Sequence, residues 1–165
     1  DIGGRVARKL SGMDVRLLAY DPYPNQEKAR SLGVTLADMD TVLSQSDIVS
    51  IHMPSIPSTY HVMGREAFRR MKSGSWLINT ARGALVDTEA LIEAVTCGHL
   101  AGAALDVFEQ EPLPADAPVL HTPGILCTPH AGAETVETYQ NISMMAAQAV
   151  IDSLNGLEPK NWLNK

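Results

Sequence analysis

The sequence is poor in cysteine and aromatic residues and has no excess of basic charge. Its 2 cysteines, Cys97 and Cys127, do not form a C-x-x-C pair, so neither a disulfide framework nor a structural zinc site is expected. We expect two small buried thiols in a reducing compartment. The 13 basic and 19 acidic side chains give a net charge of −6, which argues against binding to nucleic-acid phosphates. Small molecules are therefore the expected partners.

Long apolar runs are also absent from the sequence. No stretch approaches the ~18 uninterrupted apolar residues that a membrane span requires, so we expect a soluble, cytoplasmic protein with no membrane partner. With 165 residues, of which 45% are hydrophobic and 19% charged, the chain suits one globular domain, or one domain plus an appendage, with a buried core.

Short apolar runs alternate with segments of helical periodicity along the chain. The runs predict strands, bounded by proline, glycine or aspartate, at 15–20, 47–51, 75–79, 101–105 and 124–127. The periodic segments predict helices at 2–10, 26–32, 39–44, 65–71, 87–96 and 134–155. This alternation predicts a parallel sheet covered by helices on both faces, which is the doubly wound α/β class. Ligands of such sheets bind beyond the carboxyl ends of the strands.

The last predicted helix has a broad apolar face. It is made by Val136, Tyr139, Ile142, Met145, Ala146, Ala149, Val150 and Leu154. We expect this face, together with Met144, to pack into the core.

The beginning of the chain has part of a glycine-rich loop. Ile2-Gly3 opens the first predicted helix and resembles the end of G-x-G-x-x-G, where the third glycine allows close packing and the helix N-terminus binds a pyrophosphate. The strand and the two glycines that would precede it are not in the sequence. Asp21, at the carboxyl end of the next predicted strand, is placed to bind ribose hydroxyls and to repel a 2′-phosphate. An Asp-Pro turn with Pro22 is the alternative interpretation.

Three successive strand-end loops carry an arginine, a carboxylate and a histidine, namely Arg82, Glu111 and His130. An arginine fork fits a substrate carboxylate, and a histidine moves a proton on a substrate oxygen. A carboxylate orients the histidine and favours its charged form. The set suits hydride transfer on a 2-oxo or 2-hydroxy acid. Taken singly, each residue also fits an ordinary surface role, and Glu109 is the alternative acid.

Three segments, 78–87, 102–112 and 129–132, are similar to the signatures of the D-isomer-specific 2-hydroxyacid dehydrogenases. The similarity extends over nearly the whole chain. It implies that Arg82 binds the substrate, that His130 is the general acid and base, and that Glu111 pairs with His130. It also implies an NAD groove lined by Ile2, Gly3, Asp21, Pro54, Thr59, Thr80, Ala81, Arg82, Asp106, His130 and Gly132, with Asp106 at the nicotinamide carboxamide.

Chains of that family are much longer, with a substrate domain made mostly from the segment before the dinucleotide-binding domain. The resemblance therefore implies that residues 1–155 are a Rossmann-like NAD-binding domain without its first strand, and that 156–165 return toward a substrate domain. It further implies a homodimer that acts on a small 2-hydroxy or 2-oxo acid. Formate is not an expected substrate, because a formate dehydrogenase would carry glutamine at position 111. An NAD-sensing corepressor of the same fold is the alternative function.

Overall fold

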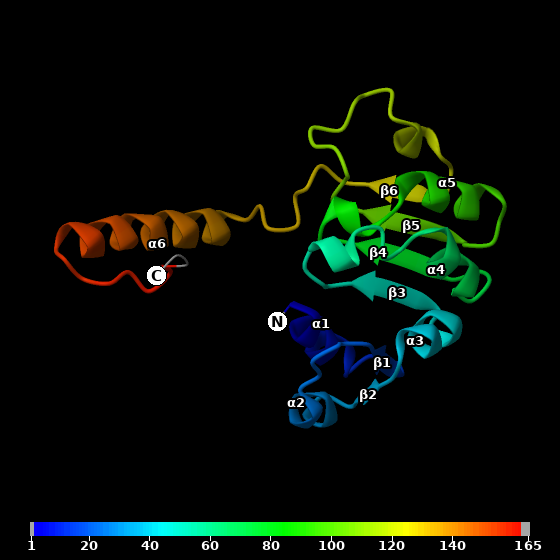
Figure 1. Cartoon of the computed structure of the whole chain (residues 1–165), viewed down its shortest axis with the longest axis horizontal. Helices are drawn as coiled ribbons and strands as arrows, with labels where there is room; N and C mark the ends of the chain where they lie inside the picture. Colours follow the sequence, from blue (N-terminus) through cyan, green and yellow to red (C-terminus); the bar gives the residue numbers. More distant parts are fainter. Residues whose placement is uncertain (1, 163–165) are drawn as a thin grey trace. The chain divides into compact units, whose positions relative to one another are not determined.

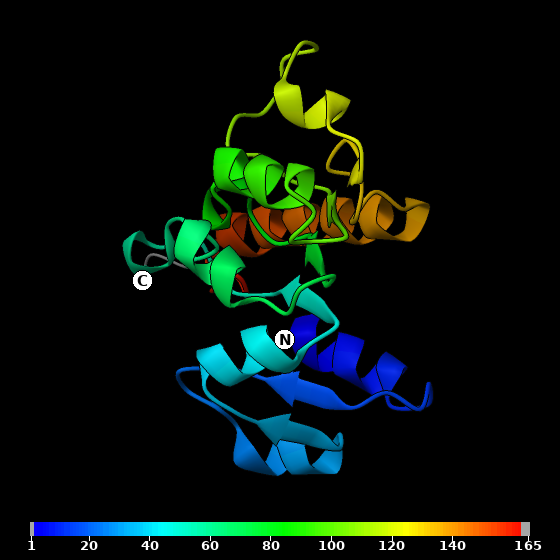
Figure 2. The ribbon, with the colours of Figure 1, turned by 90° about the vertical axis from the view of Figure 1, so that its right-hand side faces the viewer.

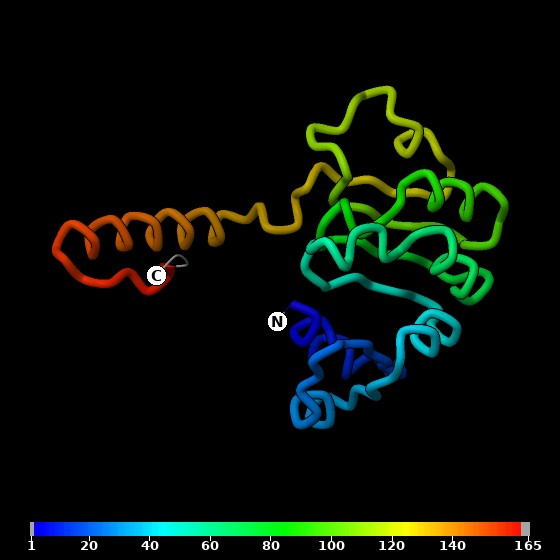
Figure 3. The backbone as a smooth tube through the Cα atoms, viewed as in Figure 1, coloured from blue at the N-terminus to red at the C-terminus, as the bar shows by residue number. Residues whose placement is uncertain are grey.

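The computed structural model describes residues 2–162, and its backbone divides into two compact units, Asp1–His130 and Ala131–Lys165. The path of the chain through each unit can be followed in Figure 3. Residues 163–165, the end of the expected return toward a substrate domain, lie outside the described residues.

Strands and helices alternate through the first unit, as the sequence predicts. The strands are β1 (Leu17–Ala19), β2 (Val34–Leu36), β3 (Ile48–Ile51), β4 (Trp76–Asn79), β5 (Gly102–Leu105) and β6 (Ile125–Cys127). The helices are α1 (Ile2–Leu10), α2 (Gln26–Ser31), α3 (Met39–Gln45), α4 (Arg65–Arg70) and α5 (Thr88–Thr96). Short 3₁₀ helices η1 (Pro57–Thr59), η2 (Gly83–Leu85) and η3 (Pro118–His121) lie between them. Strand β2 is the one described strand that the sequence did not predict.

All strand pairs in the described residues are parallel, which confirms the predicted doubly wound α/β class. Strands β3, β4, β5 and β6 form one sheet in chain order, and β1 pairs with β2 in a second sheet. Helices α2 and α3 contact the second sheet (Figure 2). Because the strands of a parallel sheet point the same way, the loops that follow β4, β5 and β6 leave from one edge (Figure 1).

The core lies on one face of the four-stranded sheet. Leu77 of β4 is fully buried and clusters with Phe68 of α4 and Leu91 of α5. Along β3 and β4 burial alternates, and on the opposite face Trp76 and Leu126 are exposed. Helices α4 and α5 of the first unit thus pack on the core face of this sheet.

The second unit contains one long helix, α6 (Val136–Leu154). Its N-terminus is capped by the side chain of Thr135, which accepts a hydrogen bond from the backbone N–H of Thr138. No residue of α6 is buried, and Met144 is 70% exposed. Only a short irregular segment follows the helix in this unit, so the packing of its apolar face into a core stays a prediction.

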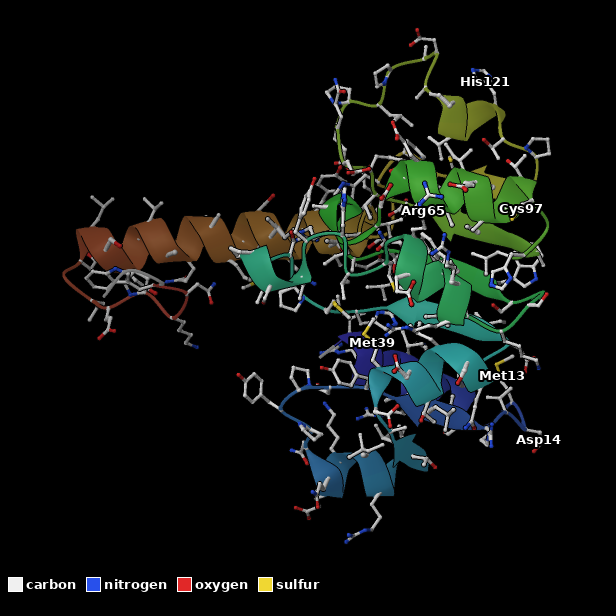
Figure 4. The ribbon with its side chains drawn as sticks, turned by 45° about the vertical axis from the view of Figure 1, so that its right-hand side comes forward. Met13, Asp14, Met39, Arg65, Cys97 and His121 are labelled. Carbon is white, nitrogen blue, oxygen red and sulfur yellow. The ribbon has the colours of Figure 1, made fainter. Side chains whose placement is uncertain are left out.

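The two thiols also differ from their prediction as buried groups. Cys97 is exposed just after α5 (Figure 4). Cys127 in β6 is half-buried, and this burial raises the pKa of its thiol. Both thiols are free.

Among residues 2–162, no helix combines the length and the apolar character needed to cross a bilayer.

Candidate active site

Three strand-end loops of the first unit line a shallow hollow of about 280 Å³. Arg82 comes from the loop after β4, Glu111 from the loop after β5 and His130 from the loop after β6. The other lining residues are Ser55, Gly83, Ala84, Val107, Phe108 and Glu109. The hollow therefore brings together the three side chains that the sequence singles out as a group.

Glu111 and His130 are hydrogen-bonded to each other. Glu111 Oε2 lies 2.8 Å from His130 Nδ1, and Glu111 Oε1 accepts a hydrogen bond from the backbone N–H of Phe108 at 2.9 Å. These bonds, first that of His130 and then that of Phe108, hold the pKa of the Glu111 carboxyl below its usual value. Since Nδ1 faces Glu111, Nε2 is the ring nitrogen left to meet a substrate.

The backbone at His130 adopts a conformation that is uncommon for a residue with a side chain. Its φ of 56° lies in the left-handed region, and its N–H donates to the carbonyl of Thr128. Such backbone positions gather at functional sites, where the surrounding structure holds them.

Buried Asn79 shapes the loop that carries Arg82. The Asn79 side chain donates from Nδ2 to the carbonyl of Arg82 at 2.9 Å and accepts from the backbone N–H of Ala81 at 3.0 Å. Arg82 itself is exposed and donates from Nη1 to the carbonyl of Ala81 at 2.6 Å. The rest of the guanidinium group has no partner within residues 2–162, so it is available to a carboxylate ligand.

Gly83 lets this loop pack against the loop after β5. A Cβ atom at Gly83 would lie 1.9 Å from the carbonyl carbon of Phe108 and 2.4 Å from the backbone nitrogen of Glu109. Only glycine permits this approach. The arginine loop and the carboxylate loop are thereby fixed side by side.

Asp106 is held at the end of β5 with its side chain largely buried. Its Oδ1 accepts a hydrogen bond from the hydroxyl of Thr128 at 2.5 Å, and its backbone N–H donates to the carbonyl of Asn79. The residue is 7% exposed. Sequence reasoning selected Asp106 but missed Thr128 and Asn79, whose polar side chains at strand ends were the available signal.

The remaining residues of the predicted NAD groove come from α1, from the segments after β3 and β4, and from the second unit. Gly3 in α1 packs closely on His52, since a Cβ at Gly3 would lie 3.3 Å from the His52 Cβ. Burial lowers the pKa of His52. The Thr59 hydroxyl donates to the carbonyl of Pro54 at 2.8 Å and so shapes the turn after β3. Exposed Ile2 begins α1, Thr80 and Ala81 follow β4, and Gly132 belongs to the second unit.

Asp21 lies exposed just beyond β1, as the sequence predicts. Its Oδ1 accepts a hydrogen bond from the backbone N–H of Tyr23 at 2.8 Å, which is the turn of the alternative interpretation. The second carboxylate oxygen has no partner in the described part of the chain. The turn and a ribose contact are therefore compatible.

A second acid and histidine pair lies beside the hollow, and sequence reasoning missed it. His61 Nε2 is 2.5 Å from Glu109 Oε1, while Glu109 Oε2 accepts from the backbone N–H and the hydroxyl of Thr88. Burial acts to raise the pKa of Glu109, but the bonds from Thr88 and His61 outweigh it, and the net pKa is lowered. Glu111, and not Glu109, is the acid that contacts His130.

A parallel α/β domain with polar residues at the carboxyl ends of its strands is typical of nucleotide-binding domains. The chain belongs to the family of the D-isomer specific 2-hydroxyacid dehydrogenase, NAD binding domain, whose sequence model matches residues 1–132. NAD is therefore the cofactor of this domain. The close packing of Gly3, the carboxylate of Asp21 and the nearly buried carboxylate of Asp106 fit such a dinucleotide.

Three similar proteins, two by sequence and one by structure, carry the names of dehydrogenases or reductases. The chain is 39% identical over 163 residues to a D-3-phosphoglycerate dehydrogenase of Archaeoglobus fulgidus, covering 99% of this chain and 31% of the relative. It is 44% identical over 165 residues to a glyoxylate reductase of Thermofilum pendens, and the match covers 99% of this chain and 49% of the relative. The crystal structure of a D-lactate dehydrogenase with NAD⁺ from Lactobacillus jensenii matches with a TM-score of 0.90 at 35% identity. This match covers 99% of this chain and 53% of that one. The chain thus spans about half, or less, of the length of these relatives.

Proposed function

We propose that the intact protein interconverts a D-2-hydroxy acid and its 2-oxo acid with NAD. The observation that carries the proposal is the shared hollow, where exposed Arg82 faces the same space as the hydrogen-bonded Glu111 and His130. Fold and family support the cofactor, and these three side chains supply the groups that a 2-oxo acid needs.

Each of the three side chains has a distinct role in this proposal. In the reducing direction, protonated His130 gives a proton from Nε2 to the substrate oxygen, and in the oxidising direction the neutral ring takes it back. Glu111 holds the ring through Nδ1 and stabilises its charge. Arg82 binds the substrate carboxylate with its free N–H groups. NAD, when bound, supplies or accepts the hydride.

The larger organisation of the protein is also part of the proposal. We assign residues 1–155 to the NAD-binding domain, since α6 continues to Leu154, and 156–165 to a return toward a substrate domain. A homodimer and a cytoplasmic location complete the proposal, and two free cysteines fit a reducing compartment.

The test is NADH oxidation by the intact protein with glyoxylate, hydroxypyruvate, phosphohydroxypyruvate and pyruvate. We expect reduction of at least one of these 2-oxo acids to the D-hydroxy acid. His130→Asn, which keeps a residue that tolerates positive φ, should lower kcat/KM by about 10²–10⁴-fold without loss of NAD binding. Absence of turnover with every substrate, or full activity of His130→Asn, would contradict the proposal.

The relatives reported above do not support the regulatory alternative, since all are named as dehydrogenases or reductases.

A further inference from the structure

His61 is attached to the arginine loop by its backbone. Its N–H donates to the carbonyl of Ala84 at 2.9 Å, two residues after Arg82. The next contact along the chain is a parallel bridge between Met63 and Val86. The φ of His61 is 49°, a left-handed conformation that turns the chain at this point. The loop after β3 is therefore joined to the loop after β4 beside the hollow.

The side chain of His61 reaches a different loop. Its Nε2 lies 2.5 Å from Glu109 Oε1, and its ring stacks on Tyr60 with centroids 3.9 Å apart. Glu109 belongs to the loop after β5, which also carries Glu111. One residue, His61, thus contacts both neighbouring loops.

Glu109 closes the connection by capping the first residue of α5. Its Oε2 accepts from the backbone N–H of Thr88 at 3.1 Å and from the Thr88 hydroxyl. A helix-start N–H has no partner within its own helix, so this carboxylate satisfies it. Both oxygens of Glu109 are thus bonded to the protein, one to His61 and one to Thr88. Its position in the lining of the hollow is therefore structural.

The hydrogen bonds of this pair tie together the elements that place Arg82 and Glu111. Gly83 packs against the backbone of Phe108 and Glu109, and the N–H of Phe108 donates to Glu111. A shift of Glu109 would therefore move the Phe108 backbone, and with it the anchor of Glu111. The catalytic groups depend on a spacing of this kind, because a misplacement of about 1 Å is costly to catalysis.

We propose that His61 and Glu109 are a positioning pair, which sets the distance between the Arg82 loop and the Glu111 loop for the 2-hydroxy acid reaction. The inference rests on the proposed function for the reaction that it serves. It assigns neither residue a contact with the substrate.

The test uses four variants of the intact protein: His61→Asn, Glu109→Ala, the double variant, and Glu109→Gln. Asparagine tolerates the positive φ of His61 but does not reach Glu109. We expect each of the first two variants to lower kcat/KM for the 2-oxo acid about 10- to 100-fold, the value of a lost charge-assisted hydrogen bond, with NAD affinity kept. The double variant should have a kcat/KM no lower than that of the less active single variant, because both substitutions remove the same contact. Glu109→Gln, which still accepts from Thr88, should recover part of the activity.

His121→Asn is the matched control, since His121 lies exposed in η3, outside the lining of the hollow (Figure 4). It should leave kcat/KM unchanged. Amide hydrogen exchange gives a readout that needs no turnover. The N–H groups of His61 and Phe108 should exchange faster in both single variants, and the N–H of Ala103, bonded to Gly124 within the sheet region, should not.

The outcomes separate the two proposals. A wild-type protein that reduces 2-oxo acids, with variants of unchanged kcat/KM or unchanged exchange, overturns the positioning pair alone. Additive losses in the double variant overturn it too, because independent sites add. A wild-type protein without turnover overturns the proposed function, and with it the role of the pair in that reaction.

Discussion

The pair of Glu111 and His130 makes a prediction about pH at the residue scale. Glu111 keeps a lowered pKa because His130 and the Phe108 N–H bond to it, so it stays ionised through the range in which a histidine titrates. In the proposed reaction, reduction needs protonated His130 and oxidation needs the neutral ring, so the two directions should have opposite pH limbs. Glu111→Gln keeps a hydrogen-bonding side chain and deletes the charge that favours the protonated ring.

We therefore expect Glu111→Gln to lose reduction rate at neutral pH and to extend oxidation to lower pH. The measurement is kcat/KM against pH in both directions, with a deuterium isotope effect to show that hydride transfer limits the rate. Glu137→Gln on α6 is the control, since Glu137 is exposed in the second unit. Unmoved pH limbs in Glu111→Gln would exclude Glu111 as the functional partner of His130.

Asp21 makes a second prediction at this scale, about the choice of cofactor. Asp21→Asn keeps an oxygen that can accept from the Tyr23 N–H, so the turn after β1 survives, while the charge that repels a 2′-phosphate is lost. The ratio of kcat/KM for NADPH to that for NADH should rise. An unchanged melting temperature of the Asp21→Asn variant would show that the turn is kept. A parent protein that already accepts both cofactors equally would contradict the role of Asp21.

The candidate site could be predicted from the sequence only for residues whose chemistry shows in a strand-end motif. Arg82, Glu111 and His130 stand in three such loops, and the structure places them around one hollow. His61 was not found, because its partner Glu109 is 48 positions away and nothing in the local sequence connects them. Thr128 stands near a strand end, but a threonine is common there, and its bond to Asp106 depends on the fold.

At the scale of elements, the contact between the Arg82 loop and the Glu111 loop predicts a severe effect of Gly83→Ala. The added methyl group would overlap the Phe108 backbone, which cannot move aside as a flexible side chain could. We expect a loss of about 1–3 kcal/mol in stability, the usual cost of overpacking, and a larger relative loss in kcat/KM because Arg82 and Glu111 move apart. Thermal unfolding and kinetics measure the two effects.

Gly12→Ala is the control for this change, because a Cβ at Gly12 meets nothing within 4 Å. It should leave both the melting temperature and kcat/KM as they are. If Gly83→Ala behaves in the same way, the close approach of the two loops is not needed for activity.

Most helices and strands could be predicted from the sequence, because periodicity and turn residues act locally. Features that depend on contacts between distant segments could not be predicted. Strand β2 is 3 residues long with two exposed positions, too short for a strand pattern. The apolar face of α6 was read correctly as apolar, but periodicity cannot say what covers it. Periodicity likewise cannot say what covers the second face of the four-stranded sheet, where Trp76 and Leu126 are exposed.

At the scale of the whole molecule, the exposed apolar side chains of each unit predict how a polypeptide of residues 1–165 behaves. Ile142 and Met145 on α6 are 60% and 53% exposed, and Leu126 on the sheet is 65% exposed. Apolar patches of this kind are aggregation liabilities when nothing covers them. We expect the 165-residue polypeptide to bind a hydrophobic dye and to self-associate in sedimentation, and the intact protein to bind much less dye per chain.

Substitutions on the two sides of α6 show which surface is responsible. Ile142→Glu places a charge on the apolar face and should reduce both self-association and dye binding of the polypeptide, because a charge is costly to bury without a partner. Gln140→Glu makes a matched change at another exposed position of the helix, two residues away and therefore on a different side, and should alter neither. Equal effects of the two substitutions would point to net charge, since both raise the acidity of a chain that already carries −6. A polypeptide that is monomeric and free of dye would show that α6 is covered in solution by residues of its own chain.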